Sequence, residues 1–177
     1  AELRAALNQA GVLSYRPLLF ESAFPRDALV CVSTHDLPTW RGYWEAHDLK
    51  LRKQLGLSVD FEQELAARDQ EKSRLAKALQ REHLDLSARS AHAFIARTPS
   101  KLAMLQPEDV FEMLDQANLP GTVDQHPNWR RKLPLALERW GTHREVAALR
   151  DVMAERRVSV AAPLATYLRR FDLELSS

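Results

Sequence analysis

A continuous apolar segment, ALVCVST at residues 28–34, runs directly into a histidine and an aspartate, His35 and Asp36. Short apolar runs without polar alternation are typical of strands in parallel sheets, because helices cover both faces of such sheets. A second strand, also rich in strand-forming residues, is expected at residues 12–21. A helix is expected at residues 39–55, and this order of elements predicts a parallel α/β layer.

Most of the remaining chain is expected to be helical. Amphipathic stripes predict helices at residues 60–83, 87–97, 142–157 and 162–175. One further strand is expected at residues 109–115, DVFEMLD. The loop that follows is dense in asparagine, proline and glycine, which regular elements do not tolerate, and it contains Asn118.

Composition limits the partners and the chemistry. The chain has 177 residues, 45% apolar and 28% charged, and its net charge of +1 gives no electrostatic reason to expect nucleic acid. Cys31 is the single cysteine, which excludes an internal disulfide and favours a reducing compartment. One cysteine and six dispersed histidines give no metal pattern, and no apolar run reaches membrane-spanning length. We therefore expect a cytoplasmic protein without a metal, a cofactor, a nucleic-acid partner or a membrane.

Two interpretations of the His35-Asp36 pair stay open on spacing alone. Asp36 or Thr39 can serve as the N-cap of the following helix, with His35 incidental. Alternatively, the pair stands at the carboxyl end of a strand, where open α/β sheets and barrels place their chemistry. A carboxylate that accepts two hydrogen bonds beside a histidine that donates one suits a hydroxyl-rich ligand.

Three segments resemble one known family. STHDLPTWRGYWE (residues 33–45) closely resembles the His-Asp segment of the bacterial amylomaltases, the 4-alpha-glucanotransferases of glycoside hydrolase family 77. QPEDVFEMLDQANLPGTVDQHPNWRRKL (residues 106–133) resembles the stretch around that family's last barrel strand. NQAGVLSYRPLLFE (residues 8–21) is similar to the stretch after its catalytic glutamate. The segments occur in family order and span most of the chain up to about Leu133.

The resemblance implies an enzyme that cleaves an α-1,4-glucan donor and passes the segment to an acceptor sugar, with retention through a covalent intermediate. It implies that Asp36 is the transition-state-stabilising carboxylate, His35 its sugar-binding neighbour, and Asn118 a loop residue that lines the same cleft. Trp40 stands where the family pattern has leucine, and Gln125 where it commonly has glutamate. These two departures bear on acceptor preference.

The family's nucleophile and acid/base have no matching motif in this sequence. A (β/α)8 barrel also needs about 250 residues, and the chain opens within a helix at Ala1. The expected fold is therefore the C-terminal part of such a barrel with an inserted helical subdomain, predominantly helical, as one partial domain. We expect barrel strands with their helices and loops at 1–56 and 106–140, a helical insertion at 57–105, and C-terminal helices at 141–177.

Two further expectations concern the chain alone. It is expected to be inactive and to self-associate through unpaired strand edges. Two alternative functions stay open: a non-catalytic glucan-binding remnant, and a helical module that binds a protein partner. Retardation by glucan in a native gel discriminates between them.

Overall fold

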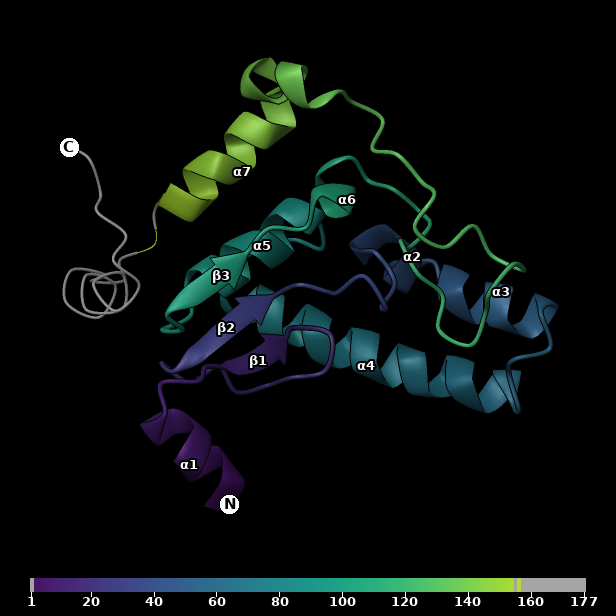
Figure 1. Cartoon of the computed structure of the whole chain (residues 1–177), viewed down its shortest axis with the longest axis horizontal. Helices are drawn as coiled ribbons and strands as arrows, with labels where there is room; N and C mark the ends of the chain where they lie inside the picture. The colour runs from purple at the N-terminus through teal and green to yellow at the C-terminus, as the bar shows by residue number, and fades with distance from the viewer. Residues whose placement is uncertain (1, 155, 157–177) are drawn as a thin grey trace.

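The structure is a computed structural model that describes residues 2–154 and 156. Its centre is a parallel sheet in the order β1-β2-β3, made of β1 (Ser14–Pro17), β2 (Ala28–Cys31) and β3 (Leu102–Met104). The other regular elements of the described chain are helices, joined by long loops, as Figure 1 shows. The predicted parallel α/β layer is therefore confirmed.

The register aligns the carboxyl ends of the three strands. Pro17 pairs with Cys31, and Cys31 pairs with Met104. Pro17, whose nitrogen cannot donate to a ladder, is the last residue of an outer strand, which is a position that tolerates proline. Because all three strands point the same way, the segments that follow them emerge at one edge of the sheet.

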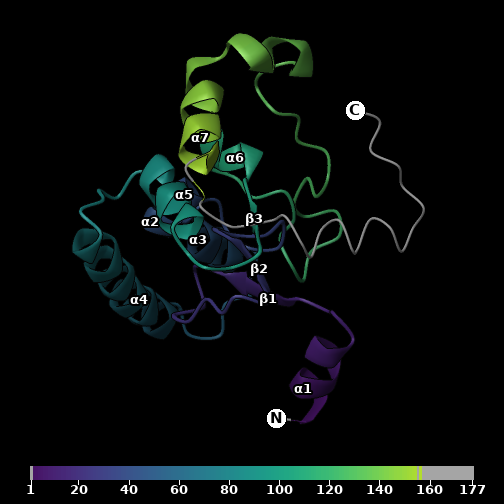
Figure 2. The ribbon, with the colours of Figure 1, turned by 90° about the vertical axis from the view of Figure 1, so that its left-hand side faces the viewer.

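Two helices cover one face of the sheet and form the core with it. These are α4 (Phe61–Arg81) and α5 (Ala88–Ala96), which lie on the same side of the strands in Figure 2. Burying this apolar surface is the main stabilising contribution to the fold, at roughly 25 cal/mol per Å² removed from water. The core side chains are Leu18, Leu19, Val30, Val32, Trp40, Tyr43, Leu75, Leu79, Ala91 and Ile95.

The opposite face of the sheet carries large exposed side chains. Tyr15, Leu29 and Leu102 share one row of the register, and Tyr15 and Leu102 are 52% and 45% exposed. Met104, two residues along β3, is 52% exposed on the same face. An apolar face of this kind is typical of a surface that contacts other protein, because isolated soluble domains rarely expose such patches.

The helix expected at residues 39–55 is two helices. α2 (Trp40–Trp44) and α3 (His47–Gln54) are separated at Ala46, whose φ of 52° is left-handed and cannot continue a helix. The predicted end of this helical segment at residue 55 is confirmed, because Gly56 takes a φ of +69° just after α3. The break turns the chain immediately after the segment that carries His35 and Asp36.

The strand expected at residues 109–115 is wrong. That stretch forms the short helix α6 (Pro107–Val110) and then an irregular turn, because Pro107 begins a helix readily and Glu112 adopts a φ of 48°. The third strand is instead β3, which lies inside the range predicted to be a helical insertion. Residues 106–140, where barrel strands were expected, are all described and contain no strand.

The remaining helices lie toward the two ends of the chain. α1 (Glu2–Gln9) extends away from the sheet in Figure 1. The turn η1 (Leu137–Thr142) leads into α7 (Arg144–Ala154), which packs on α5. The last helix, expected at 162–175, lies outside the described residues. Among the described helices, none has the length and apolar character needed to cross a bilayer.

Candidate functional site

His35, Asp36 and Asn118 meet at the edge of the sheet where β2 ends. The Asn118 side-chain amide donates to Asp36 Oδ1 at 2.6 Å, and His35 Nε2 lies 3.1 Å from Asp36 Oδ2. The Asn118 backbone N–H also donates to the His35 carbonyl oxygen at 3.0 Å. The structure therefore brings together the three residues that the sequence singled out, with the Asp36 carboxylate half-exposed to solvent.

Thr39, and not Asp36, caps the following helix. The Thr39 hydroxyl accepts from Gly42 N at 3.0 Å and donates to the Met113 carbonyl oxygen at 2.6 Å. Of the two candidate caps, only Thr39 fills that position, which leaves the Asp36 carboxylate available to a ligand. The same hydroxyl fastens the β2–α2 loop to the segment after α6.

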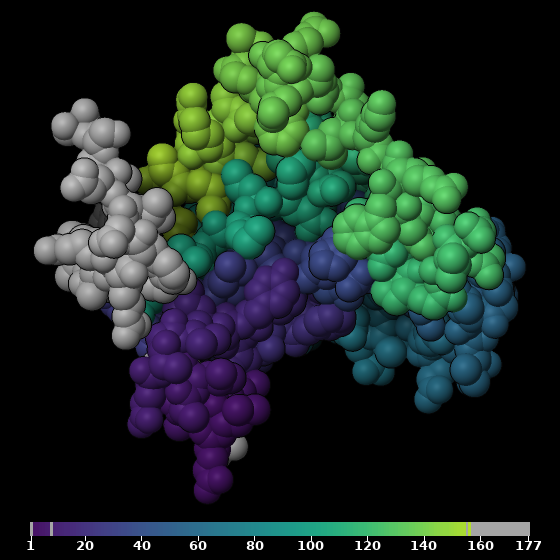
Figure 3. Space-filling model, viewed as in Figure 1, coloured from purple at the N-terminus to yellow at the C-terminus, as the bar shows by residue number. Residues whose placement is uncertain are grey.

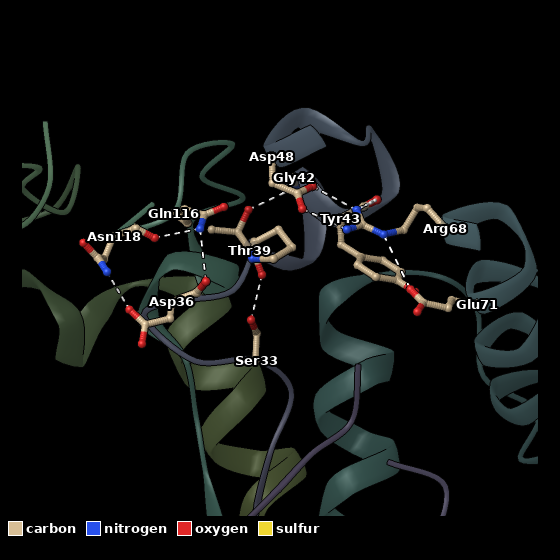
Figure 4. A network of polar contacts seen from close by, with 11 residues as sticks. Ser33, Asp36, Thr39, Gly42, Tyr43, Asp48, Arg68, Glu71, Gln116 and Asn118 are labelled. Atoms are coloured by element: carbon tan, nitrogen blue, oxygen red, sulfur yellow. Dashed lines mark hydrogen bonds and ion pairs between the residues drawn. The ribbon is translucent and has the colours of Figure 1, made fainter. Parts of the chain in front are cut away.

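Gln116 links the two loop segments that carry Asp36 and Asn118. Its side-chain nitrogen donates to the Asn118 carbonyl oxygen at 2.7 Å and to the Asp36 carbonyl oxygen at 3.3 Å, as Figure 4 shows. Both neighbours are acceptors, so the nitrogen of the amide must face them. Gln116 is only 4% exposed. It therefore fixes the backbone positions of Asp36 and Asn118, whose side chains are hydrogen-bonded to each other.

A second support lies between α2, α3 and α4. Arg68 donates to both carboxylate oxygens of Asp48, at 2.9 and 2.8 Å, and to the Tyr43 carbonyl oxygen at 3.3 Å. The Arg68 guanidinium also lies 4.3 Å from the centre of the Tyr43 ring. Arg68 and Asp48 are both buried. This pair, drawn in Figure 4, fixes α2 and α3 on α4 and so holds the loop with Asp36.

The loop after Asn118 is tied both to itself and to α3. Asn128 accepts from Leu119 N at 2.9 Å and donates to Thr122 Oγ1 at 2.8 Å. Asp115 contacts His47 Nε2 at 2.8 Å and Arg131 Nη1 at 3.0 Å. In the space-filling view of Figure 3 this green loop lies against the blue segment that includes α3. Residues 130–132 are Arg, Arg and Lys, and two of these three cations thus pair with carboxylates within the chain.

Trp40 is a packing residue and lies away from the ligand-facing side. It is 3% exposed, and its indole N–H donates to the Leu86 carbonyl oxygen at 2.7 Å. Gln125 accepts from Val123 N at 2.8 Å within its loop. Trp40 therefore contributes to the core, and an effect of either departure on acceptor preference stays a prediction.

Asp109 is a buried carboxyl beneath the site. Its Oδ1 accepts from Trp40 N at 2.6 Å, while Oδ2 has no hydrogen-bond partner among residues 2–154 and 156. Burial, with a smaller contribution from Glu108, raises the pKa of Asp109 from its ordinary 3.8 to about 7. The folded chain therefore prefers the protonated form, and stability is lost as the pH rises toward 7.

We expect Asp109→Asn to stabilise the protein at neutral and alkaline pH. Asparagine stays neutral and can still accept from Trp40 N, whereas Asp109 must ionise in a buried site. The gain over wild type should grow between about pH 4 and 7 and then level off at on the order of 2 to 4 kcal/mol. Urea denaturation at several pH values measures it. A gain that is the same at pH 4 and pH 8 would contradict the assignment to ionisation.

Sequence reasoning missed Gln116 and Asp109, which support the site. The strand predicted at 109–115 gave no reason to expect that the Asp109 side chain accepts a hydrogen bond from the backbone N–H of Trp40 at the start of α2. Gln116 does not belong to a sequence motif, and only its position two residues before Asn118 could have indicated a role at the site. In the described part of the chain, no group of three or more histidine, cysteine or acidic side chains is arranged to hold a metal ion.

The chain is similar to known proteins over most of its length. A profile of the 4-alpha-glucanotransferase family, glycoside hydrolase 77, matches residues 1–137. A 4-alpha-glucanotransferase of Haemophilus influenzae is 30% identical over 163 residues, which cover 76% of this chain and 23% of that protein. A 4-alpha-glucanotransferase of Mycobacterium tuberculosis is 29% identical over 155 residues, which cover 78% of this chain and 21% of that protein. The chain thus spans about a quarter of the length of these curated relatives.

Two solved structures share the fold. The crystal structure of amylomaltase from Corynebacterium glutamicum superposes with a TM-score of 0.76 at 24% identity, over 86% of this chain and 27% of that one. Amylomaltase from Streptococcus agalactiae in complex with acarbose superposes with a TM-score of 0.61 at 15% identity, over 89% of this chain and 30% of that one. At these identities the likeness concerns the fold alone.

Proposed function

This chain belongs to the 4-alpha-glucanotransferase family, glycoside hydrolase 77, and on that premise we propose that it forms the C-terminal part of a (β/α)8 barrel enzyme that transfers segments of α-1,4-glucan to acceptor sugars. Three consecutive parallel strands in the order β1-β2-β3 are compatible with a section of such a barrel. The strand ends that share one edge would then form part of its catalytic face.

One observation carries this proposal: the carboxylate of Asp36 is held at the end of β2 by two site neighbours. Asn118 contacts one carboxylate oxygen and His35 the other. A carboxylate that is oriented by neighbouring polar side chains is suited to bind the hydroxyl groups of a sugar. The sugar side would be the half-exposed face of Asp36, because Gln116 and the loop backbone occupy the other side.

In a retaining transfer, one carboxylate attacks the sugar and a second carboxyl group protonates the leaving oxygen, and then acts as base. The transition state between them resembles an oxocarbenium ion, which carries positive charge. Asp36 would act as a third carboxylate that stabilises this charge and binds sugar hydroxyls, which is most effective when its orientation is fixed in advance. His35 and Asn118 would supply that orientation and share the hydroxyl contacts.

The nucleophile and the acid/base would come from a part of the enzyme outside these 177 residues. No carboxylate in this sequence lies in a motif that resembles either of them.

The rest of the barrel would cover the exposed apolar face of the sheet, which consists of Tyr15, Leu102 and Met104. In the chain alone this face and the open strand edges favour self-association. A reducing, cytoplasmic location suits the unpaired Cys31.

Affinity electrophoresis tests whether the chain binds glucan. We expect soluble amylose in a native gel to retard the purified chain, and dextran, an α-1,6-glucan, to leave its mobility unchanged. The Asp36→Ala variant should be retarded less than wild type, since it loses a hydroxyl acceptor. Unchanged mobility of wild type in amylose would contradict the proposal and favour a module that binds protein through the exposed sheet face.

A further inference from the structure

Trp129 is a large exposed aromatic side chain beside the site. It is 65% exposed, and its ring centroid lies 5.0 Å from that of His35 at an angle of 47°. His35 in turn neighbours Asp36. An apolar surface of this size exposed next to polar site groups is unusual unless it meets a partner.

The loop forces this position on Trp129 at an energetic cost. Its φ is 60°, in the left-handed region that residues with a Cβ atom avoid. The Trp129 N–H donates to the Ala117 carbonyl oxygen at 2.9 Å, and the preceding Asn128 is fixed by its contacts to Leu119 and Thr122. Backbone strain that is maintained by surrounding contacts is concentrated at functional sites.

The neighbouring groups match two different parts of one ligand. A glucose ring has a face of C–H groups and a rim of hydroxyls. The indole of Trp129 provides an apolar aromatic plane, while Asp36 and Asn118 provide acceptors and a donor near it. We infer that Trp129 is a stacking platform for a glucose unit of the α-1,4-glucan next to Asp36. This inference rests on the proposed function.

The left-handed backbone makes a clean test possible. Glycine adopts a φ of 60° without strain, so Trp129→Gly removes the ring while the loop conformation is retained. Trp129→Tyr keeps an aromatic plane. Val123→Ala is the matched control, because Val123 is a 77% exposed apolar residue of the same loop. The probe is soluble amylose in native gels, and circular dichroism measures the thermal midpoint of each variant.

We expect Trp129→Gly to weaken amylose binding by about tenfold or more, with a thermal midpoint equal to or above that of wild type. Trp129→Tyr should bind within about threefold of wild type by the same reasoning, and Val123→Ala should match wild type. Wild-type-like retardation of Trp129→Gly would overturn the inference while the proposed function stands. Equal losses in the Gly and Tyr variants with lowered midpoints would also overturn it, since packing would explain them. Unretarded wild type would contradict the proposed function itself, and the inference with it.

Discussion

Replacement of Asp36 by asparagine should reduce glucan transfer by about 100-fold or more in the complete enzyme that carries this segment, the scale of losing a preorganised charged group from a transition state. The substitution preserves the shape and the acceptor for the Asn118 amide, which lies 2.6 Å from Asp36 Oδ1. It removes the negative charge and the second acceptor oxygen. Initial rates of maltotriose disproportionation measure the effect.

Stability should separate this role from capping. Thr39 is the residue that caps α2, so Asp36→Asn should leave the thermal midpoint almost unchanged. Asp124→Asn is the matched control, because Asp124 is an exposed carboxylate on the neighbouring loop. It should change neither rate nor stability. Normal transfer by the Asp36→Asn enzyme would show that the carboxylate has no part in the reaction.

Arg68→Met should destabilise the chain by about 3 to 5 kcal/mol, the usual cost of leaving one partner of a buried ion pair unpaired. Asp48 would lose both of its bonds to the guanidinium, and the Tyr43 carbonyl would lose a donor. Denaturant unfolding monitored by circular dichroism measures the change. Because α2 and α3 depend on this pair, the site loop is expected to become more sensitive to proteolysis as well.

Two controls isolate the buried pair. Arg150→Met breaks a surface pair with Asp151, in which both side chains are more than 60% exposed, and should cost less than about 1 kcal/mol. The double variant Arg68→Met with Asp48→Leu removes both charges and should recover much of the loss. If the Arg68→Met variant is as stable as wild type, the Arg68–Asp48 pair contributes nothing to holding α2 in place.

The parts of the fold that the sequence predicts are those with local causes. The apolar run of β2 and the left-handed Gly56 each follow from a few neighbouring residues, and the structure agrees with both. The strand β3 has only three residues, LAM, and exists because it pairs with β2 some seventy residues away. The sequence therefore gave no sign of β3, and a strand was predicted instead at residues 109–115, which form a longer stretch of apolar and acidic residues.

The candidate site shows the same division. His35 and Asp36 follow the apolar run of a strand, and the segments that contain them and Asn118 resemble those of one family, so each was predicted as a site residue. Gln116 supports the site through a contact with a residue 80 positions away, and Trp129 lies beside His35 in a loop that contacts of Asn128 close. Such long-range contacts depend on packing that no local pattern encodes.

We propose that this chain supplies a stabilising carboxylate to a retaining transfer but neither the nucleophile nor the acid/base. Maltotriose disproportionation by the purified 177-residue chain, followed as glucose release, tests it most directly. We expect no release from the chain alone, and release when a polypeptide with the other two carboxylates completes the barrel, dependent on Asp36. Glucose release by the chain alone that Asp36→Ala abolishes would contradict the account.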